Sequence, residues 1–481
     1  MSNLMEKLFG TDGVRGIYGR APLTPAWIMP LGQVTAALFR RKNSGGGGEV
    51  FVGRDTRRSG PDIVRALRRG FERAGCGKIV DAGVISTPGL AYLLARYKPL
   101  FGAMVSASHN PPAFNGIKFF DSNGLKLAPE MEREIEGRLR GEAAASAAGF
   151  LPAAPAWKPR GGLKPSGLQR DYLDFLKSTF PAHLDLGGMR IVVDCGHGAA
   201  WRFAPRIFEE LGARVRKMGC RPNGRNINSG CGALAPESMR REVVRGKFDC
   251  GLSLDGDGDR VIFSDEKGHL MDGDILLTIA GVFLKQRRVL TSNKLVMTVM
   301  SNSGIIEFLE GRGIAVAQVP VGDRNVYAGL EAEGAVLGGE SSGHIIFRQF
   351  ANSGDGTLTA LQVLSMLKSM GVPMSRLLGR LSAVERPGAA ARRAAVPRLF
   401  PHILKNVDAE KKIPLEDCPA LRRALKRAQA EFRGRGRVVV RYSGTEPLLR
   451  ILVEGPTRRQ IRRISGELEG AFREDMIRRT T

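Results

Sequence analysis

The stretch CGLSLDGDGDR, residues 250–260, joins a short continuous apolar run to a loop in which aspartates alternate with glycines. Such a run, without the alternation of a half-exposed strand, is typical of a parallel strand that is covered on both faces. Similar runs alternate with helical patterns along the chain, so the sequence predicts successive α/β units. The other runs are at 49–54, 78–83, 101–108, 190–196 and 294–300, and the helical patterns include 62–73, 204–211, 304–310 and 356–370.

The C-terminal part of the chain has a different pattern. Helical segments at 421–433 and 457–477 surround two strand patterns, RVVVRY (437–442) and LLRILVEG (448–455). Strands and helices grouped in this way predict a smaller α+β domain.

Two segments have the composition of linkers. Residues 141–167 are rich in Ala, Pro and Gly, and residues 386–402 are rich in Pro and Arg. We therefore expect three related mixed α/β domains followed by a smaller α+β C-terminal domain. The expected boundaries are 1–160, 161–268, 269–383 and 384–481.

The composition is that of an ordinary globular protein with an unusual charge. Hydrophobic residues make up 43% of the 481 residues and charged residues 25%, which excludes a disordered, collagen-like or coiled-coil chain. The formal net charge is +25. A surplus of this size favours anionic partners, namely nucleic acid, an acidic membrane surface or phosphorylated small molecules.

Targeting signals and cysteines indicate the compartment. Charged residues interrupt the first 16 residues, where a signal peptide needs an apolar stretch. The best apolar run, at 275–284, is shorter than the roughly 20 residues that cross a bilayer. The six cysteines form no CxxC pair, which fits a reducing cytosol and does not indicate zinc. We expect a soluble, cytoplasmic protein.

Three carboxylates, those of Asp255, Asp257 and Asp259, follow the apolar strand at the end where open α/β sheets place their ligands. The intervening glycines allow a tight turn, and the three charges alone would repel one another. A hard divalent cation removes that repulsion, and an all-oxygen set suits Mg²⁺. An EF-hand loop would need glycine at Arg260, and a plain acidic turn is the other alternative. We favour a metal site, with Arg260 beside it to meet a phosphate.

The segment SASHNPPAFNGIKFF, residues 106–120, places Ser108 on a loop after a strand, where we expect it to be exposed. A serine hydroxyl can hold a phosphoryl group stably, and a nearby cation would draw the charge of that group. Ser106 is the rival position, and a turn serine is the alternative. Lys118 is either a cation over a phosphate, a general acid/base or a surface lysine.

The segment RYSGTEPLLR, residues 441–450, has the composition of an anion-binding nest. It lacks the lysine of a nucleotide P-loop. A β-hairpin turn is an equally good interpretation. The residues that would bind the anion are Arg441, Ser443, Thr445 and Arg450, with the backbone around Gly444.

The segment GGESSGH, residues 338–344, alternates three polar side chains on a glycine-rich loop. Glu340 and Ser342 could bind sugar hydroxyls, and His344 could transfer a proton. Taken alone, this motif has little specificity.

Two further turns combine glycine, arginine and aspartate: GTDGVRG at 10–16 and GRDTRRSG at 53–60. They could hold a phosphate through Arg15. They could equally be ion-paired structural turns.

Together these motifs resemble the α-D-phosphohexomutase superfamily and, within it, the bacterial phosphoglucosamine mutases. SASHNP, DGDGDR, GESSGH and RYSGTEP occur in the order and spacing of that family. GTDGVRG, GRDTR, VMTVMSNSG and VGDRNV resemble the glucosamine branch rather than the mannose/glucose branch. The resemblance implies four domains around a central cleft, the last domain being mobile.

The resemblance also implies a role for each motif. Ser108 would be the phosphorylated serine, and one Mg²⁺ would bind its phosphoryl group together with Asp255, Asp257 and Asp259. The other implied roles are acid/base chemistry for Lys118 and His344, support of the transferring group for Arg15 and Arg260, sugar binding for Glu340, Ser342, Asp323 and Arg324, and binding of the second phosphate for Arg441, Ser443, Gly444, Thr445 and Arg450.

The implied reaction interconverts glucosamine 6-phosphate and glucosamine 1-phosphate through phosphoserine and a sugar 1,6-bisphosphate intermediate. The implied partner is a phosphorylated hexosamine, with no nucleic acid and no membrane, and the chain would act as a monomer or a homodimer. Three alternatives stay open. They are a phosphoglucomutase or phosphomannomutase with the same mechanism, a Mg²⁺-dependent phosphatase, and a basic nucleic-acid-binding protein, although RNP motifs are missing from the sequence.

Overall fold

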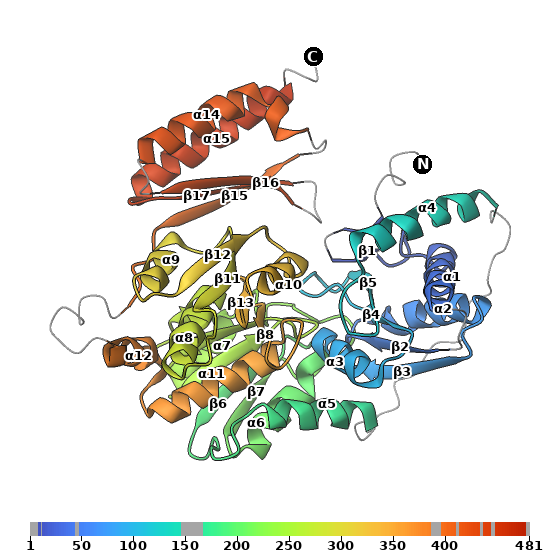
Figure 1. Cartoon of the computed structure of the whole chain (residues 1–481), viewed down its shortest axis with the longest axis horizontal. Helices are drawn as coiled ribbons and strands as arrows, with labels where there is room; N and C mark the ends of the chain where they lie inside the picture. Colours follow the sequence, from blue (N-terminus) through green and yellow to red (C-terminus); the bar gives the residue numbers. More distant parts are fainter. Residues whose placement is uncertain are drawn as a thin grey trace.

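In a computed structural model the chain forms four successive units, each built on its own sheet (Figure 1). The first unit lies on the right of Figure 1, the second and third lie together on the left, and the fourth lies above them. The three α/β units and the C-terminal α+β unit confirm the predicted fold class. The structure describes residues 8–10, 12–43, 48–145, 167–385, 396–409, 413–432, 436–443 and 448–477.

The first three units share one strand topology. The strand orders are β3-β2-β4-β5, β7-β6-β8-β9 and β12-β11-β13-β14. In each unit the first three strands run parallel and the fourth runs antiparallel. The predicted relationship between the three blocks is therefore visible in the sheets, which are mixed as expected. The strands are β1 Val14–Ile17, β2 Glu49–Arg54, β3 Lys78–Val84, β4 Phe101–Val105, β5 Phe114–Phe120, β6 Arg190–Asp194, β7 Arg214–Met218, β8 Cys250–Leu254, β9 Val261–Asp265, β10 Leu270–Met271, β11 Lys294–Thr298, β12 Ala315–Val319, β13 Leu337–Gly339 and β14 Ile345–Phe347.

Several helices of these units begin after a residue whose side chain caps the first turn. Ser86, Asp272 and Asp355 each accept hydrogen bonds from backbone amides in the first turn of the helix that follows. Among the described helices, none is both long and apolar enough to span a membrane. The helices are α1 Pro25–Lys42, α2 Gly60–Arg73, α3 Thr87–Tyr97, α4 Pro129–Ala145, α5 Gly167–Ser178, α6 Phe203–Glu210, α7 Glu237–Gly246, α8 Gly273–Gln286, α9 Ser303–Glu310, α10 Asp323–Ala332, α11 Gly356–Met370 and α12 Leu377–Glu385.

Strand residues of alternate orientation pack into different cores. In β2, Val50 and Val52 pack with α1 and α2 on one face of the sheet, and Phe51 packs with α3 on the other. The second and third units share one continuous core, in which Leu252 of β8 and Leu295 of β11 belong to the same cluster. These two units therefore form a common base for the loops at the ends of their strands.

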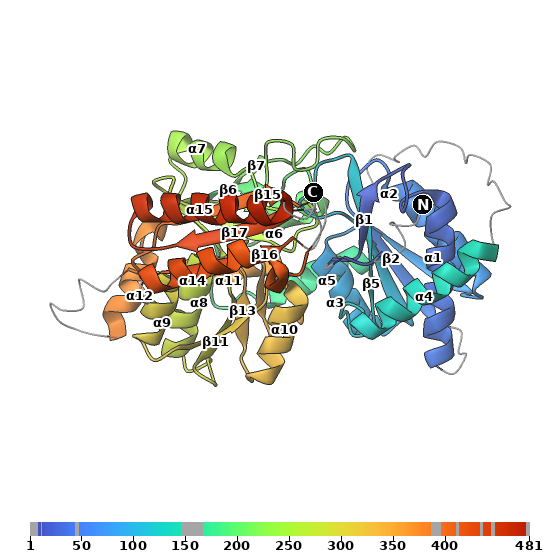
Figure 2. The ribbon, with the colours of Figure 1, turned by 90° about the horizontal axis from the view of Figure 1, so that it is seen from above.

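The fourth unit has its own core and a three-stranded antiparallel sheet in the order β15-β17-β16. Two helices lie side by side over one face of this sheet (Figure 2). The two predicted strands and two predicted helices are present, and an unpredicted strand, β15, completes the sheet. The elements are β15 His402–Asp408, α14 Pro419–Phe432, β16 Arg437–Tyr442, β17 Leu448–Glu454 and α15 Arg458–Ile477.

Candidate active site

The three predicted metal ligands converge in the loop after β8. One oxygen from each of Asp255, Asp257 and Asp259 lies within 4.8 Å of the other two, and all three side chains are buried. Gly256 lets this loop approach the serine loop closely, because a Cβ at that position would lie 2.5 Å from the carbonyl oxygen of Ser108. The local spacing of the aspartates therefore produces the cluster that the sequence predicts.

The electrostatics of this cluster fit a bound cation. Burial, together with the charges of Asp259 and Asp257, raises the pKa of Asp255 well above its usual range. Oδ1 of Asp257 and Oδ1 of Asp259 have no hydrogen-bond partner among the described residues, although both are buried. Buried carboxylate oxygens of this kind need a counter-charge. The donor set of three carboxylates suits Mg²⁺.

The hydroxyl of Ser108 lies against the cluster, and its Oγ donates to Oδ2 of Asp255 at 2.7 Å. The expectation that Ser108 is exposed is wrong, since it is only 1% exposed. Two backbone carbonyls of its loop, including its own, accept hydrogen bonds from Asn228 of the second unit, which covers the loop. Oγ of Ser106 donates instead to Oδ2 of Asp55. Of the two rival serines, only Ser108 therefore contacts the cluster of Asp255, Asp257 and Asp259.

Lys118 is a buried cation between two carboxylates. Its Nζ lies 2.9 Å from Oδ2 of Asp257 and 2.9 Å from Oδ2 of Asp12. Burial alone would lower the pKa of Lys118, but the two carboxylates outweigh burial and hold the pKa above its usual value. A surface role is thus excluded, and the ammonium places one positive charge beside the metal ligands.

Two arginines contact residues of the serine loop. Nη1 of Arg15 donates to the carbonyl oxygen of Ala107 and to Oδ1 of Asn110, both at 3.1 Å. Arg260 has Nη1 3.4 Å from Nδ1 of His109. Burial and the two guanidinium groups lower the pKa of His109 to about 4, so this ring is neutral at physiological pH. Both arginines line the same cavity and can meet an anion there.

His344, in the third unit, contacts the aspartate loop that follows β8. Its Nδ1 lies 3.4 Å from Oδ2 of Asp259, and its Nε2 accepts a hydrogen bond from the amide of Gly354. This pair of contacts assigns the proton to Nδ1. Burial opposes protonation of His344, but the contact with Asp259 outweighs burial and raises the pKa of the imidazole.

Glu340 and Ser342 form the polar side of the third unit. Oε1 of Glu340 accepts from the amide of Gly322 at 2.8 Å, and Oγ of Ser342 donates to Oε2 at 3.1 Å. Asp323 lies close by and pairs with Nζ of Lys126 at 2.5 Å. These residues all line the cavity.

Arg324 occupies a different place from the other predicted sugar-binding residues. Its guanidinium pairs with Glu132 of α4, at 2.7 Å between Nη2 and Oε1. It thus joins the third unit to the first, and it is not one of the described residues that line the cavity.

The fourth unit contributes two arginines on neighbouring strands. Arg441 and Arg450 are directly opposite each other in the β16–β17 ladder, and both line the cavity together with Ser443. Burial and the neighbouring charge of Arg450 lower the pKa of Arg441. Two like charges placed opposite each other are unfavourable unless an anion lies between them. Gly444 and Thr445, also predicted to bind the second phosphate, lie outside the described residues.

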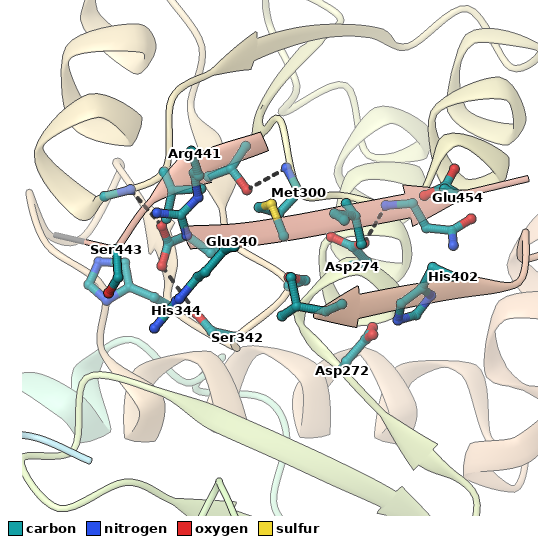
Figure 3. Close-up of a pocket in the computed structure, with 18 of the residues that line it drawn as sticks. Asp272, Asp274, Met300, Glu340, Ser342, His344, His402, Arg441, Ser443 and Glu454 are labelled. Atoms are coloured by element: carbon teal, nitrogen blue, oxygen red, sulfur yellow. Dashed lines mark hydrogen bonds between the residues drawn. The ribbon is translucent and has the colours of Figure 1, made fainter. Parts of the chain in front are cut away.

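All four units meet at one cavity of about 1010 Å³. Figure 3 shows Glu340, Ser342 and His344 beneath Arg441, with Asp272, Asp274 and His402 towards the other end. The central cleft that the resemblance implies is therefore present. The described residues of the predicted site that line it are Arg15, Asp259, Arg260, Asp323, Glu340, Ser342, His344, Arg441, Ser443 and Arg450.

Sequence reasoning missed several residues that build the site. Asp12 pairs with Lys118, Lys126 pairs with Asp12, and Asn228 holds the serine loop. Asp12 lies within the GTDGVRG turn, and its carboxylate is the only feature of the local sequence that could have indicated a place in the site. In the other turn, GRDTRRSG, Arg57 pairs with Asp55 inside the protein, so this turn is the ion-paired structural alternative.

Four family models match successive parts of the chain. Their descriptions are "Phosphoglucomutase/phosphomannomutase, alpha/beta/alpha domain I" for residues 6–146, the corresponding domain II for 170–268, domain III for 272–384, and the C-terminal domain for 404–471. Together these matches cover most of the sequence.

Curated relatives match over nearly the whole length. The chain is 41% identical over 480 residues to the phosphoglucosamine mutase of Symbiobacterium thermophilum, covering 98% of this chain and 100% of that protein. It is 41% identical over 461 residues to the phosphoglucosamine mutase of Chlamydia trachomatis, covering 96% and 95%.

Solved structures share the fold. A phosphoglucomutase/phosphomannomutase family protein from Burkholderia thailandensis has a TM-score of 0.75 at 20% identity, covering 98% of this chain and 97% of that one. An N-acetylphosphoglucosamine mutase from Aspergillus fumigatus, solved with GlcNAc-6P and magnesium, has a TM-score of 0.62 at 18% identity, covering 97% and 96%.

Proposed function

The chain belongs to the phosphoglucomutase/phosphomannomutase family, and on that premise we propose that it interconverts glucosamine 6-phosphate and glucosamine 1-phosphate. The enzyme is thus an intramolecular phosphotransferase of the isomerase class. The observation that carries the proposal is the hydrogen bond of 2.7 Å from Oγ of Ser108 to Asp255, beside two buried carboxylate oxygens that have no hydrogen-bond partner among the described residues.

The choice of glucosamine rests on the relatives. Proteins about 40% identical over nearly their full length carry the name phosphoglucosamine mutase. The cavity fits a phosphorylated sugar, because a carboxylate and a hydroxyl, those of Glu340 and Ser342, line it together with cationic groups of the first and fourth units. Polar groups of this kind orient sugar hydroxyls, and the arginines bind phosphate.

One Mg²⁺ held by Asp255, Asp257 and Asp259 is part of the proposal. The oxygens without a hydrogen-bond partner among the described residues and the raised pKa of Asp255 support it. When bound, the ion would neutralise charge on the transferring phosphoryl group. Phosphorylation of Ser108 is likewise proposed, since this hydroxyl is the one that reaches the carboxylates.

The chain's own residues explain how a phosphoryl group could move between Ser108 and the sugar. In the forward direction the bond from Oγ to phosphorus breaks as a bond from phosphorus to the C1 oxygen forms, and the C1 hydroxyl releases its proton to a base. Lys118 and His344 are the proposed acid/base residues. Because the effect of burial on the pKa of Lys118 is outweighed by two carboxylates, which raise it, this ammonium could give a proton to the departing Oγ, whereas His344 is the one of the two that could accept the proton of the C1 hydroxyl. Arg15 and Arg260 both contact the serine loop and line the cavity, where they would bind and orient the transferring group.

The second half of the reaction needs the sugar in the opposite orientation. The 6-phosphoryl group would return to Ser108, leaving the 1-phosphate. Throughout, the phosphate that is not transferring would be held by Arg441, Ser443 and Arg450, together with Gly444 and Thr445. A cavity of about 1010 Å³ leaves room for the bisphosphate to turn without leaving the enzyme.

We also infer a cytoplasmic location. All six cysteines lie in the described part of the chain and none forms a disulfide, which fits a reducing compartment.

The experiment that tests the proposal is a phosphorus NMR assay of the purified chain with Mg²⁺ and a catalytic amount of sugar 1,6-bisphosphate. Glucosamine, glucose and mannose 6-phosphates are compared separately. We expect the highest kcat/KM with glucosamine 6-phosphate and loss of activity with a chelator. A clear preference for mannose, or release of inorganic phosphate without any isomer, would overturn the proposal.

A further inference from the structure

Arg57, in the turn after β2, has a side chain that is 0% exposed. A guanidinium has five N–H donors in a fixed plane, and here five acceptors surround it. Four of them are backbone carbonyls, three from the short loop between β4 and β5 and one from the first residue of β5. The acceptors are Oδ2 of Asp55 at 2.9 Å from Nε, the carbonyl oxygens of Pro111 at 2.5 Å and Phe114 at 2.8 Å from Nη1, and those of Ser108 at 2.9 Å and Asn110 at 2.8 Å from Nη2.

The conformation of this loop needs support from its surroundings. Ser108 has a φ of +50°, in the left-handed region that a non-glycine residue rarely adopts. Its amide donates to Oγ of Ser106, which donates in turn to Oδ2 of Asp55. Its carbonyl oxygen accepts from Arg57. The pair of Asp55 and Arg57 therefore fixes both peptide groups of Ser108.

A second contact sets the distance between this loop and the metal ligands. Nδ2 of Asn228, in the second unit, donates to the carbonyl oxygens of Ser108 and Asn110, at 2.9 and 3.1 Å. These are two of the carbonyls that also accept from Arg57. The first unit thus gives the loop its shape through Arg57, and the second unit holds that shaped loop beside Asp255.

We propose that Arg57 is a positioning residue for phosphoryl transfer, which places Oγ of Ser108 opposite Asp255 without touching the substrate. This inference rests on the proposed function, because it assigns a task to the serine that carries the phosphoryl group. Its physical basis is the steep dependence of in-line transfer on the position of the reacting oxygen. Lysine cannot replace the arginine, because its three donors are not arranged in a plane.

The test compares Arg57→Ala and Arg57→Lys with Arg58→Ala, a matched control at the exposed neighbouring position. Steady-state kinetics give kcat and KM with glucosamine 6-phosphate, and circular dichroism gives the folded fraction. Intact mass follows the single-turnover rate at which glucosamine 1,6-bisphosphate phosphorylates Ser108. Both Arg57 variants should lose about 100-fold or more in kcat and in the phosphorylation rate per folded molecule, with KM changed by less than about threefold. Arg58→Ala should match the wild type.

Chemical rescue separates positioning from a general loss of structure. Ethylguanidinium should enter the space left in Arg57→Ala and restore kcat by about tenfold or more, with no effect on Arg58→Ala or on Ser108→Ala. The proposal is overturned if either folded Arg57 variant keeps near-wild-type kcat, or if ethylguanidinium restores nothing. It is also overturned if the loss follows the folded fraction alone, which includes the case in which neither variant folds.

Failure of the proposed function would look different. In that case the wild-type chain itself would not isomerise glucosamine phosphates. The rate of Ser108 phosphorylation by glucose 1,6-bisphosphate would then still compare the Arg57 variants with Arg58→Ala.

Discussion

Arg441 and Arg450 are directly opposite each other on the adjacent strands β16 and β17, and both guanidinium groups line the cavity. Like charges in opposite positions weaken a strand pair. Such a pair is understandable when both arginines bind the same anion, since each charge-assisted hydrogen bond to it is then stronger than a neutral one.

Replacing Arg441 by alanine should therefore weaken substrate binding without weakening the fold. Loss of a hydrogen bond to a charged group, worth about 1.5–3 kcal/mol, should raise KM for the sugar phosphate about 10- to 100-fold. The melting temperature of the free protein should stay the same or rise, because the substitution removes the repulsion between two like charges. The control is Arg427→Ala, an exposed arginine of α14. An unchanged KM in Arg441→Ala would contradict the anion-binding role.

Ser108→Ala should abolish isomerisation, since no other described hydroxyl of this loop reaches the metal ligands. Ser106→Ala should keep the ability to be phosphorylated, with reduced kcat, because Ser106 only supports the loop. The measurement is peptide mapping by mass spectrometry after incubation with sugar 1,6-bisphosphate. Phosphate found on Ser106, or wild-type turnover by Ser108→Ala, would disprove the assignment.

Removing the ammonium of Lys118 should affect both stability and activity. In Lys118→Ala, the buried carboxylate of Asp257 and the partly exposed carboxylate of Asp12 lose a common partner, and breaking a buried ion pair such as that with Asp257 costs about 3–5 kcal/mol. We expect a lower melting temperature together with loss of turnover. The exposed Lys42→Ala serves as the control. If Lys118→Ala melts like the wild type, the ion pairs contribute far less than their burial indicates.

The aspartate cluster could be predicted from the sequence because it is local. Asp255, Asp257 and Asp259 lie within one turn after a strand, so the strand pattern and the glycine spacing suffice to bring the oxygens together. The strands FGAMV and CGLSL could be predicted for the same reason, as short apolar runs. In contrast, β13 and β14 have three residues each, too few for a pattern to be recognised.

The burial of Ser108 could not be predicted, because it depends on another unit. Its loop lies after a strand, where exposure is the usual outcome. In the folded protein Asn228 and Gly256, both of the second unit, pack against this loop and cover it. The roles of Asp12 and Arg57 were hidden for a similar reason. A local pattern shows a charged turn, and only the tertiary contacts of that turn show what its charges pair with.

The last prediction concerns pH and Asp274, which lines the cavity at the start of α8. Burial, followed by the charge of Asp272, raises the pKa of Asp274 from 3.8 to about 6. The folded protein therefore binds a proton more tightly than the unfolded chain, so the contribution of Asp274 to stability is largest below pH 4 and is lost as the pH rises through about 6.

Asp274→Asn should remove this dependence, because an amide has no proton to lose and its oxygen can still accept from the amide of Asn302. A shift of about two pKa units corresponds to about 3 kcal/mol, so we expect the variant to gain up to that amount above pH 7 and little at pH 4. Denaturant unfolding from pH 4 to pH 8 measures the effect. Asp174→Asn, on an exposed face of α5, is the control and should follow the wild type. If Asp274→Asn and the wild type show parallel stability curves across this range, Asp274 remains ionised in the folded protein and its burial is compensated in another way.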